Sequence, residues 1–238
     1  MSERFLEGFV VDLEALAALI GTRKLAAKAV RKKVGRKSIL CDIEMTLGYD
    51  FDTDDDSMTN TDRAIRATGA RLVDAALDML AKGKPSRSAD RYTMTRITPL
   101  VLHAYAMPLG TIECVPHISS DSFGLMNPVF KALGMPILAK EYGHALLPWP
   151  YKTADDVGWP IITVAGKTVY AWQRELASDW KQHLPLPDKV FKDKQYGLDS
   201  NADLLREEIP PMLATLKKWV DKAVTKKAGL VLILDGDQ

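Results

Sequence analysis

The side chains best suited to chemistry include a dense run of aspartates within residues 50–56. These aspartates are Asp50, Asp52, Asp54, Asp55 and Asp56. The first three occupy alternate positions, as ligands of a calcium-binding EF-hand loop do. Such a loop also needs glycine at position six and glutamate at position twelve, where this sequence has Asp55 and Thr61. The calcium motif fails at both, which leaves a solvated loop, a contact surface for a basic partner, or an irregular metal site.

A second candidate combines a thiol with nearby ionisable side chains. Its members are Cys114, His117, Glu141 and His144. A cysteine nucleophile needs a base such as imidazole, but Pro116 prevents a helical arrangement of the thiol and imidazole, and no orienting carboxylate is evident. The Glu-x-x-His spacing is that of di-iron bundles, which need the motif twice, whereas this sequence has one copy. A hydrolase or transferase site assembled from these scattered residues is the alternative functional hypothesis.

No metal or cofactor site is predicted from the remaining motifs. The spacings typical of zinc sites are absent around the histidines, which are His103, His117, His144 and His183. The sequence has neither a glycine-rich phosphate loop nor the Gly-x-Ser-x-Gly turn of a serine hydrolase. The motifs therefore favour binding over catalysis.

Two further features concern partners. A basic run comprises Lys28, Arg31, Lys32, Lys33, Arg36 and Lys37. It has no interleaved aromatic residue and an acidic segment follows it, so a solvated helix face is favoured and nucleic acid is disfavoured as a partner. Trp149, Tyr151 and Trp159 cluster in a proline-rich stretch. Such aromatic residues serve either as core anchors under a long loop or as hot spots of a protein interface.

The composition is that of an ordinary globular chain. Of 238 residues, 47% are hydrophobic and 26% are charged, and 32 Lys and Arg against 31 Asp and Glu give a net charge of +1. A nearly neutral chain has no global field, so electrostatic recognition must come from local segregation of charge. The two cysteines, an N-terminus without a signal-peptide pattern, and short apolar runs predict a cytoplasmic protein with reduced thiols and no membrane partner.

In the N-terminal half, the apolar pattern predicts one strand followed by helices. Residues Phe5 to Val11 are β-prone, and Asp12 is a candidate N-cap for a helix that Gly21 ends. Further helices are expected over residues 22–34, which Gly35 ends, and over residues 62–82, which Gly83 ends. Residues 97–106 predict a buried helix that starts near Pro99, because proline is accepted in a first turn.

In the C-terminal half, the recurrent Gly and Pro of residues 108–160 predict short elements joined by turns. Residues 161–164 predict a strand, followed either by a hairpin partner at 168–170 or, as we favour, by a helix to residue 180. Two helices over residues 201–208 and 212–226 are expected to be interrupted by Pro210 and Pro211. Leu230 to Leu234 is a continuous apolar run, typical of a strand buried on both faces.

These elements predict an α+β fold in one domain over residues 1–238. A small sheet would contain the N- and C-terminal strands, with several helices covering it. The N-terminal segment from Gly8, Gly-Phe-Val-Val-Asp-Leu-Glu-Ala-Leu, and the segment from Met212 to Leu234 together resemble the YfbM-like group of uncharacterised bacterial proteins. This resemblance implies that Phe9 to Val11 lie near Leu230 to Leu234, and it implies no catalytic residues.

The expected function is binding to another protein without catalysis. A chain poor in motifs, with a dense acidic run, fits a bacterial immunity-type protein that covers a toxin's active site. A basic toxin surface would be attracted to the aspartates of residues 50–56. Asp50, Asp52, Asp54, Asp55 and Asp56, with Trp149, Tyr151 and Trp159, are therefore the predicted partner-binding residues.

Overall fold

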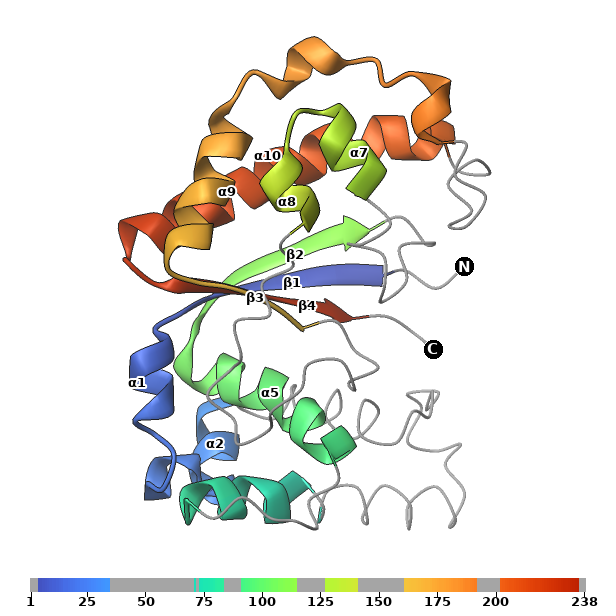
Figure 1. Ribbon diagram of the computed structural model, residues 1–238. Coiled ribbons are helices and arrows are strands. Elements are labelled where there is room, and N and C mark those ends of the chain that lie inside the picture. Colours follow the sequence, from blue (N-terminus) through green and yellow to red (C-terminus); the bar gives the residue numbers. More distant parts are fainter. Residues whose placement is uncertain are drawn as a thin grey trace, which may run out of the picture. The chain divides into compact units, whose positions relative to one another are not determined.

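The computed structural model describes residues 4–34, 71, 73–83, 91–114, 127–140, 161–191 and 202–235 (Figure 1). The chain divides into two compact units. Of the described residues, unit 1 contains residues 4–12, 108–114, 127–140, 161–191 and 202–235, and unit 2 contains the rest. The single domain expected over residues 1–238 stays a prediction.

Unit 1 is built on a sheet in which the described strands follow the order β2-β1-β4-β3. The strands are β1 (Arg4–Val11), β2 (Met107–Cys114), β3 (Ile161–Val164) and β4 (Gly229–Asp235). β1 and β4 are antiparallel, and Phe9 lies opposite Val231. β3 pairs with the other side of β4, also antiparallel. The predicted α+β class is confirmed, as is the presence of both terminal strands in one sheet.

The side chains of β4 explain its central position in the sheet. Leu230, Val231 and Leu232 are fully buried, and Ile233 is 4% exposed. Because successive side chains of a strand point to opposite faces, a run in which every residue is buried needs cover on both faces. The predicted strand buried on both faces is confirmed.

β2 is the strand that the sequence analysis did not predict. Pro108 and Gly110 indicated turns, and Gly110 does have a positive φ of 99°. β2 lies at one end of the described strand order, however, and an edge strand accepts proline because one side of it needs no backbone donor. Residues 107–114 are therefore a strand despite these two residues.

The helices of unit 1 gather on one face of the sheet (Figure 1). They are α7 (Asn127–Ala132), α8 (Pro136–Lys140), α9 (Lys167–Ala177) and α10 (Ala202–Thr225), with the short 3-10 helices η2 (Trp180–His183) and η3 (Asp188–Val190). α9 follows β3 directly and α10 leads directly into β4, so these two helices pack side by side. The strand-then-helix interpretation is confirmed, although the helix ends at Ala177 instead of residue 180, and the hairpin alternative is wrong.

α10 is one helix of 24 residues, so the predicted interruption at Pro210 and Pro211 is wrong. Both prolines lie inside the helix, although each lacks the N–H that an interior position normally donates. Ile209, Leu213 and Leu216 are buried at helical spacing across the prolines. Burial of this continuous apolar stripe outweighs the two missing hydrogen bonds.

The position of α10 over the sheet depends on a glycine in β1. A Cβ added at Gly8 would lie 2.5 Å from the ring of Trp219, which is only 5% exposed. The indole therefore occupies the space that any other residue at position 8 would fill. This contact seats the C-terminal half of α10 directly on the strand.

Unit 2 consists of helices in its described part. They are α1 (Leu13–Ala17), the 3-10 helix η1 (Arg23–Leu25), α2 (Ala27–Val34), helical residues 73–81, and α5 (Arg91–Tyr105). Two predicted helix starts are corrected. The helix predicted over residues 22–34 is divided at Ala26, whose ψ of 141° is not helical. The helix predicted to start near Pro99 begins at Arg91 instead, and Pro99 lies inside it among buried neighbours.

Gly83 follows the end of a helix in unit 2, as predicted, whereas α1 ends at Ala17, four residues before the predicted stop at Gly21. Gly21 and Gly83 have φ values of +80° and +63°, which residues with a Cβ rarely adopt. The N–H of Gly21 donates to the Leu80 carbonyl at 2.8 Å, and a Cβ on Gly83 would lie 3.3 Å from the Cα of Gly21. The turn after α1 thus approaches the end of the helix at residues 73–81 through two glycines. No helix among the described residues is long and apolar enough to cross a membrane.

Candidate functional site

The predicted partner-binding residues fall outside the described part of the chain. They are Asp50, Asp52, Asp54, Asp55, Asp56, Trp149, Tyr151 and Trp159. The residues of the alternative catalytic hypothesis are placed similarly. The backbone of Cys114 ends β2, while His117, Glu141 and His144 lie outside the described residues. The roles assigned to both sets of residues therefore stay predictions.

The described histidines lie on different elements. His103 lies on α5 in unit 2, and His183 lies on η2 in unit 1. Within the described ranges, no group of three or more His, Cys, Asp or Glu residues is arranged to hold a metal ion. The described charged residues instead divide into those that hold helices in place and those that stand on the surface.

In unit 2, carboxylates fix the start and the rotation of α2. The N–H of Ala27 donates to Oδ1 of Asp78 at 3.0 Å, which satisfies a free amide at the first turn of the helix. One turn later, Arg31 Nε lies 2.6 Å from Oδ1 of Asp74. Asp74 and Asp78 are themselves one turn apart on helical residues 73–81. Two carboxylates from one helix therefore hold the neighbouring helix at two points.

Tyr105, the last residue of α5, makes a third attachment. Its hydroxyl donates to the Lys24 carbonyl, and its ring lies 3.9 Å from Nζ of Lys33. Lys33 also donates to the Ala104 carbonyl at 3.3 Å. Burial raises the pKa of Tyr105, so the phenol keeps its donating proton throughout the neutral range. Lys33, a member of the predicted basic run, therefore helps to hold α2 against α5.

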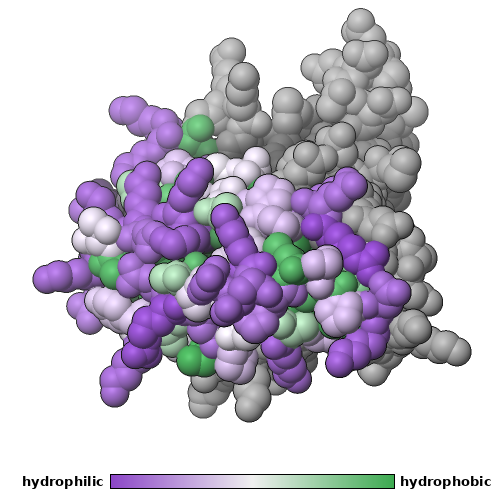
Figure 2. Space-filling model, turned by 90° about the horizontal axis from the view of Figure 1, so that it is seen from above, coloured by the Kyte–Doolittle hydropathy of each residue, from purple (hydrophilic) through white to green (hydrophobic). Residues whose placement is uncertain are grey.

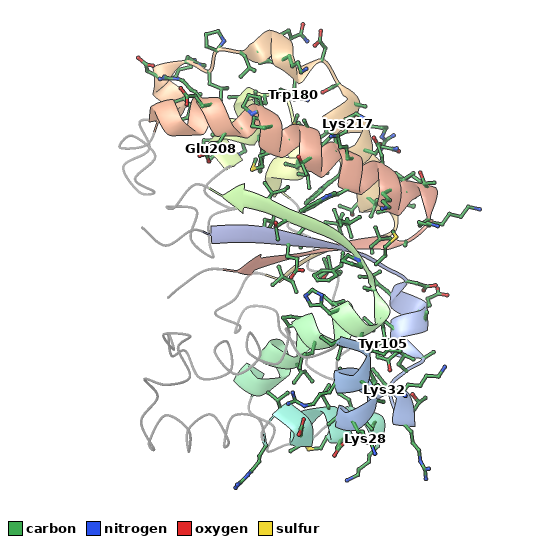
Figure 3. The ribbon with its side chains drawn as sticks, turned by 180° about the vertical axis from the view of Figure 1, so that it is seen from behind. Lys28, Lys32, Tyr105, Trp180, Glu208 and Lys217 are labelled. Carbon is green, nitrogen blue, oxygen red and sulfur yellow. The ribbon has the colours of Figure 1, made fainter. Side chains whose placement is uncertain are left out.

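Two other lysines of α2 lie on the outer side of that helix. Lys28 and Lys32 are exposed and lie one turn apart (Figure 3). The predicted solvated helix face describes these two residues, whereas Arg31 and Lys33 are held by neighbours. The basic run that the sequence analysis treated as one feature is therefore two features with different roles.

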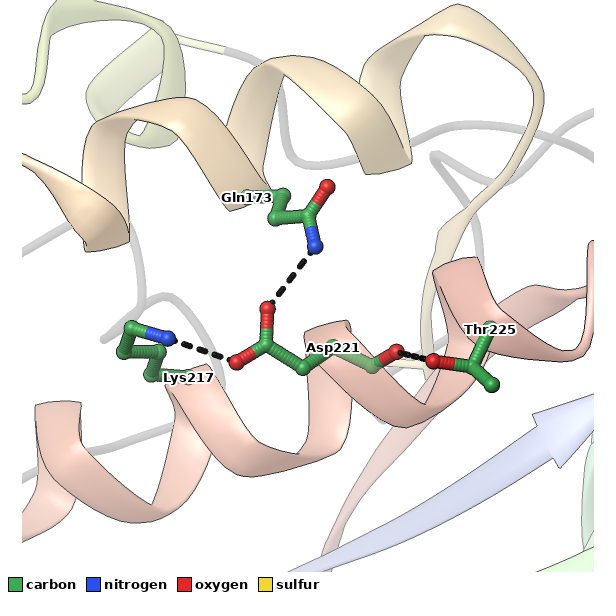
Figure 4. A network of polar contacts seen from close by, with 4 residues as sticks. All are labelled: Gln173, Lys217, Asp221 and Thr225. Atoms are coloured by element: carbon green, nitrogen blue, oxygen red, sulfur yellow. Dashed lines mark hydrogen bonds and ion pairs between the residues drawn. The ribbon is translucent and has the colours of Figure 1, made fainter.

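In unit 1, a carboxylate joins α9 to α10 (Figure 4). Asp221 accepts hydrogen bonds from Gln173 Nε2 at 2.8 Å and from Lys217 Nζ at 2.6 Å, and its carbonyl accepts from Thr225 Oγ1 at 2.8 Å. Burial raises the pKa of Asp221, but the hydrogen bonds from Lys217 and Gln173 and the charge of Lys217 together lower it more. The net pKa of Asp221 lies below its ordinary value, so the carboxylate is charged and neutralised locally by Lys217.

A second carboxylate of this layer is also fully engaged. Glu175 on α9 accepts from the N–H of Ile137 at 2.8 Å and from the N–H of Leu138 at 2.7 Å. These are amides of the first turn of α8, which have no partner inside that helix. Glu175 therefore caps α8, and its charge faces backbone donors instead of the surface.

The exposed cations of α9, of the C-terminal half of α10 and of the turn after it, together with Tyr170, make up what we call the basic face, while the exposed carboxylate of Glu207 lies in the N-terminal half of α10. The members of the basic face are exposed: Lys167, Tyr170, Arg174, Lys218, Lys222, Lys226 and Lys227. Figure 2 views the upper side of Figure 1, the side on which α9 and α10 lie, and hydrophilic side chains cover most of it. Among the described residues, Tyr170, at 47% exposure, is the large hydrophobic side chain on the surface. The basic face can attract anions and can offer one aromatic ring.

From the sequence, the lysines of α10 were predicted only to form the polar side of a helix, and no role was predicted for α9. The signal that could have found the basic face is the spacing of Lys167, Tyr170 and Arg174, which places an aromatic residue between two cations on one side of a helix. Recognising the whole face also requires α9 and α10 to pack side by side, which no local pattern predicts.

Comparisons with family models, with curated proteins and with solved structures found no match to this chain. The resemblance to the YfbM-like group stays a prediction. The proximity that it implied is present, since Phe9 to Val11 pair with Val231 to Gly229 across β1 and β4.

Proposed function

We propose that this protein acts by binding another protein through segregated surface charge, without catalysing a reaction. In its most concrete form, it is an immunity-type protein that covers the active site of a basic toxin in a bacterial cytoplasm. The contact residues in this proposal are the aspartates of residues 50–56, with Trp149, Tyr151 and Trp159 as aromatic anchors.

The observation that carries the proposal is the uneven distribution of charge along a nearly neutral chain. Residues 50–56 contain five aspartates and no Lys or Arg, although the whole chain has a net charge of only +1. The cations that offset these aspartates therefore lie in other segments of the chain. Local segregation of this kind is what electrostatic recognition by a neutral chain requires.

The described carboxylates contribute to the same argument. Asp74, Asp78, Glu175 and Asp221 each bind a cation or backbone amides within their own unit. These carboxylates already have partners and add little to the attraction of another protein. The clustered aspartates of residues 50–56 are expected to act differently, because clustered charge accelerates association with a positive surface and makes the association rate sensitive to salt.

The test is co-purification from the organism that expresses the chain, with wild-type protein and with the variant Asp52→Asn/Asp54→Asn/Asp56→Asn as baits. A basic protein should be retained by the wild type and identified by mass spectrometry. With the purified partner, the variant should associate about tenfold more slowly at low salt, and its rate should depend less on salt.

A matched control removes three carboxylates elsewhere. Glu14→Gln/Asp179→Asn/Glu207→Gln changes the net charge equally, at exposed positions of the described residues. This control should retain the partner with a nearly unchanged association rate. Unchanged association by the aspartate variant would refute the acidic-surface proposal, as would equal losses in both variants.

A further inference from the structure

The basic face of α9 and α10 is an observation separate from the acidic segment. Its cations are Lys167 and Arg174 on α9, Lys218 and Lys222 on α10, and Lys226 and Lys227 just after it. Glu175, the carboxylate of α9, and Asp221, the carboxylate of residues 211–225 of α10, are bound by the amides of α8, by Lys217 and by Gln173, and Glu207 lies eleven residues before Lys218. The positive charge of this face is therefore not cancelled by these carboxylates.

The placement of these cations is not explained by helix stability alone. Lys218, Lys222 and Lys226 follow one another at four-residue spacing, about 6 Å along the axis, where like charges repel. Lys167 is the first residue of α9, and a cation there opposes the helix dipole. Only Lys222, Lys226 and Lys227, near the C-terminal end of α10, gain from the dipole. Residues that weaken local structure in this way are expected where function requires them.

Tyr170 adds a second type of contact to the same surface. It lies three residues after Lys167 and four before Arg174, so all three share one side of α9. Its side chain is 47% exposed, while Val169, Trp172 and other apolar side chains of the helix are buried. A flat ring between two cations suits a ligand that carries both anionic groups and π faces.

We propose that the basic face binds a single-stranded nucleic acid, with its lysines and arginine on successive phosphates and a base stacked on Tyr170. Phosphate contacts from Lys and Arg supply most of the affinity of such complexes, and stacking on aromatic side chains adds to it without selecting a sequence. A single strand fits better than a duplex, because an exposed ring can stack only on an unpaired base. This proposal does not depend on the protein-binding function proposed above.

The composition of the face favours nucleic acid over an acidic protein. Protein interfaces need a buried core with apolar anchors and are depleted in lysine. The basic face has five lysines, one arginine and one aromatic ring. Nucleic-acid interfaces are more polar and more positively charged, as this face is.

The experiment measures anisotropy of labelled oligonucleotides of about 12 nucleotides, oligo(U) and oligo(dT) in parallel, against the full chain at about 50 to 200 mM salt. The dissociation constant is expected near the micromolar range at the lowest salt, and affinity should fall as salt rises. Binding of either strand supports the proposal, and a preference for one of them separates RNA from DNA as the ligand.

Lys218→Gln/Lys222→Gln should weaken binding at least about fivefold and make the logarithmic salt slope shallower by about 1.4, the value for two lost phosphate contacts on a single strand. The matched control is Lys28→Gln/Lys32→Gln, an exposed pair at the same spacing on α2. It removes the same charge and should leave affinity within about twofold of wild type, since its lysines are not part of the basic face.

Tyr170→Ala should weaken binding by about fivefold or more, whereas Tyr170→Phe should retain it, because stacking needs the ring and not the hydroxyl. Three results would overturn the proposal: a dissociation constant weaker than about 0.1 mM at low salt, equal losses in the two lysine pairs, or an unchanged affinity in Tyr170→Ala. Polyglutamate that displaces the strand and also binds Tyr170→Ala as tightly as wild type would identify an acidic protein as the ligand instead.

Discussion

Helix α2 in unit 2 and the α9–α10 pair in unit 1 are both rich in cations, yet their positions are fixed by different forces. α2 buries only Ala27 and Val30, so polar contacts from Asp74, Asp78 and Tyr105 hold it. α10 buries a long apolar stripe that includes Trp219. α10 does not depend on its ion pairs for its position, although Arg206 and Lys217 contact Asp188 and Asp221, and the cations of the basic face are exposed. In α2, where packing is slight, the contacts of Arg31 and Lys33 take the place of packing.

The largest effect should come from the packing of α10. Trp219→Ala removes a buried indole from its contact with Gly8 and should lower the free energy of unfolding by about 3 to 5 kcal/mol. Urea unfolding followed by circular dichroism measures this loss. Gly8→Ala should cost about 1 to 3 kcal/mol in the wild type but much less in the Trp219→Ala background. Equal costs of Gly8→Ala in both backgrounds would show that the two residues do not compete for space.

Removing the cap of α8 should have the next largest effect. Glu175→Ala leaves two first-turn amides without their carboxylate and should cost about 2 kcal/mol. The same urea experiment on Glu207→Ala, an exposed glutamate of α10, should show a change below about 0.5 kcal/mol. If the two variants behave alike, Glu175 is not a structural cap.

The cations of α2 provide a within-helix comparison. Arg31→Ala breaks the pair with Asp74, in which the Arg31 side chain is 19% exposed, and should cost about 1 kcal/mol. Lys32→Ala, the adjacent exposed residue, should change stability by less than about 0.5 kcal/mol. Hydrogen exchange of the α2 amides should rise in the first variant alone. Similar exchange in both would mean that the ion pair does not hold the helix.

The smallest effect is a pH dependence from Asp221. Because its pKa is lower in the folded protein, its charge stabilises the fold fully above the ordinary carboxyl pKa of 3.8, and this contribution disappears as the pH falls through the folded value. The urea midpoints of wild type and Asp221→Asn should therefore differ at pH 6 and converge once the pH is below the folded pKa of Asp221. A difference that persists unchanged in acid would assign the effect to packing instead of charge.

The fold was predictable where local pattern and tertiary structure agree. The strand at residues 4–11, the glycine stop at Gly83, and the last strand at residues 229–235 all follow from periodicity and turn chemistry. The errors occur where burial outweighs local preference, at Pro99 and at the proline pair of α10. β2 was missed because an edge strand tolerates the residues that otherwise mark turns.

The candidate site was less predictable than the fold. The sequence shows which helices carry lysine, but not which lysines meet a carboxylate or a ring from another element. Lys32 and Lys33 are neighbours, yet one is on the outer side of α2 and the other lies over Tyr105, a residue from a distant part of the sequence. Such contacts depend on tertiary packing, which local periodicity does not encode.

In this account the exposed cations of the basic face serve a partner, whereas Arg31 and Lys33 of α2 and Lys217 of α10 serve the fold. The most direct test is the salt dependence of single-strand affinity for the Lys218/Lys222 pair and the Lys28/Lys32 pair, each neutralised to glutamine. We expect a shallower slope for the α10 pair and a wild-type slope for the α2 pair. Identical slopes for the two variants would contradict the claim.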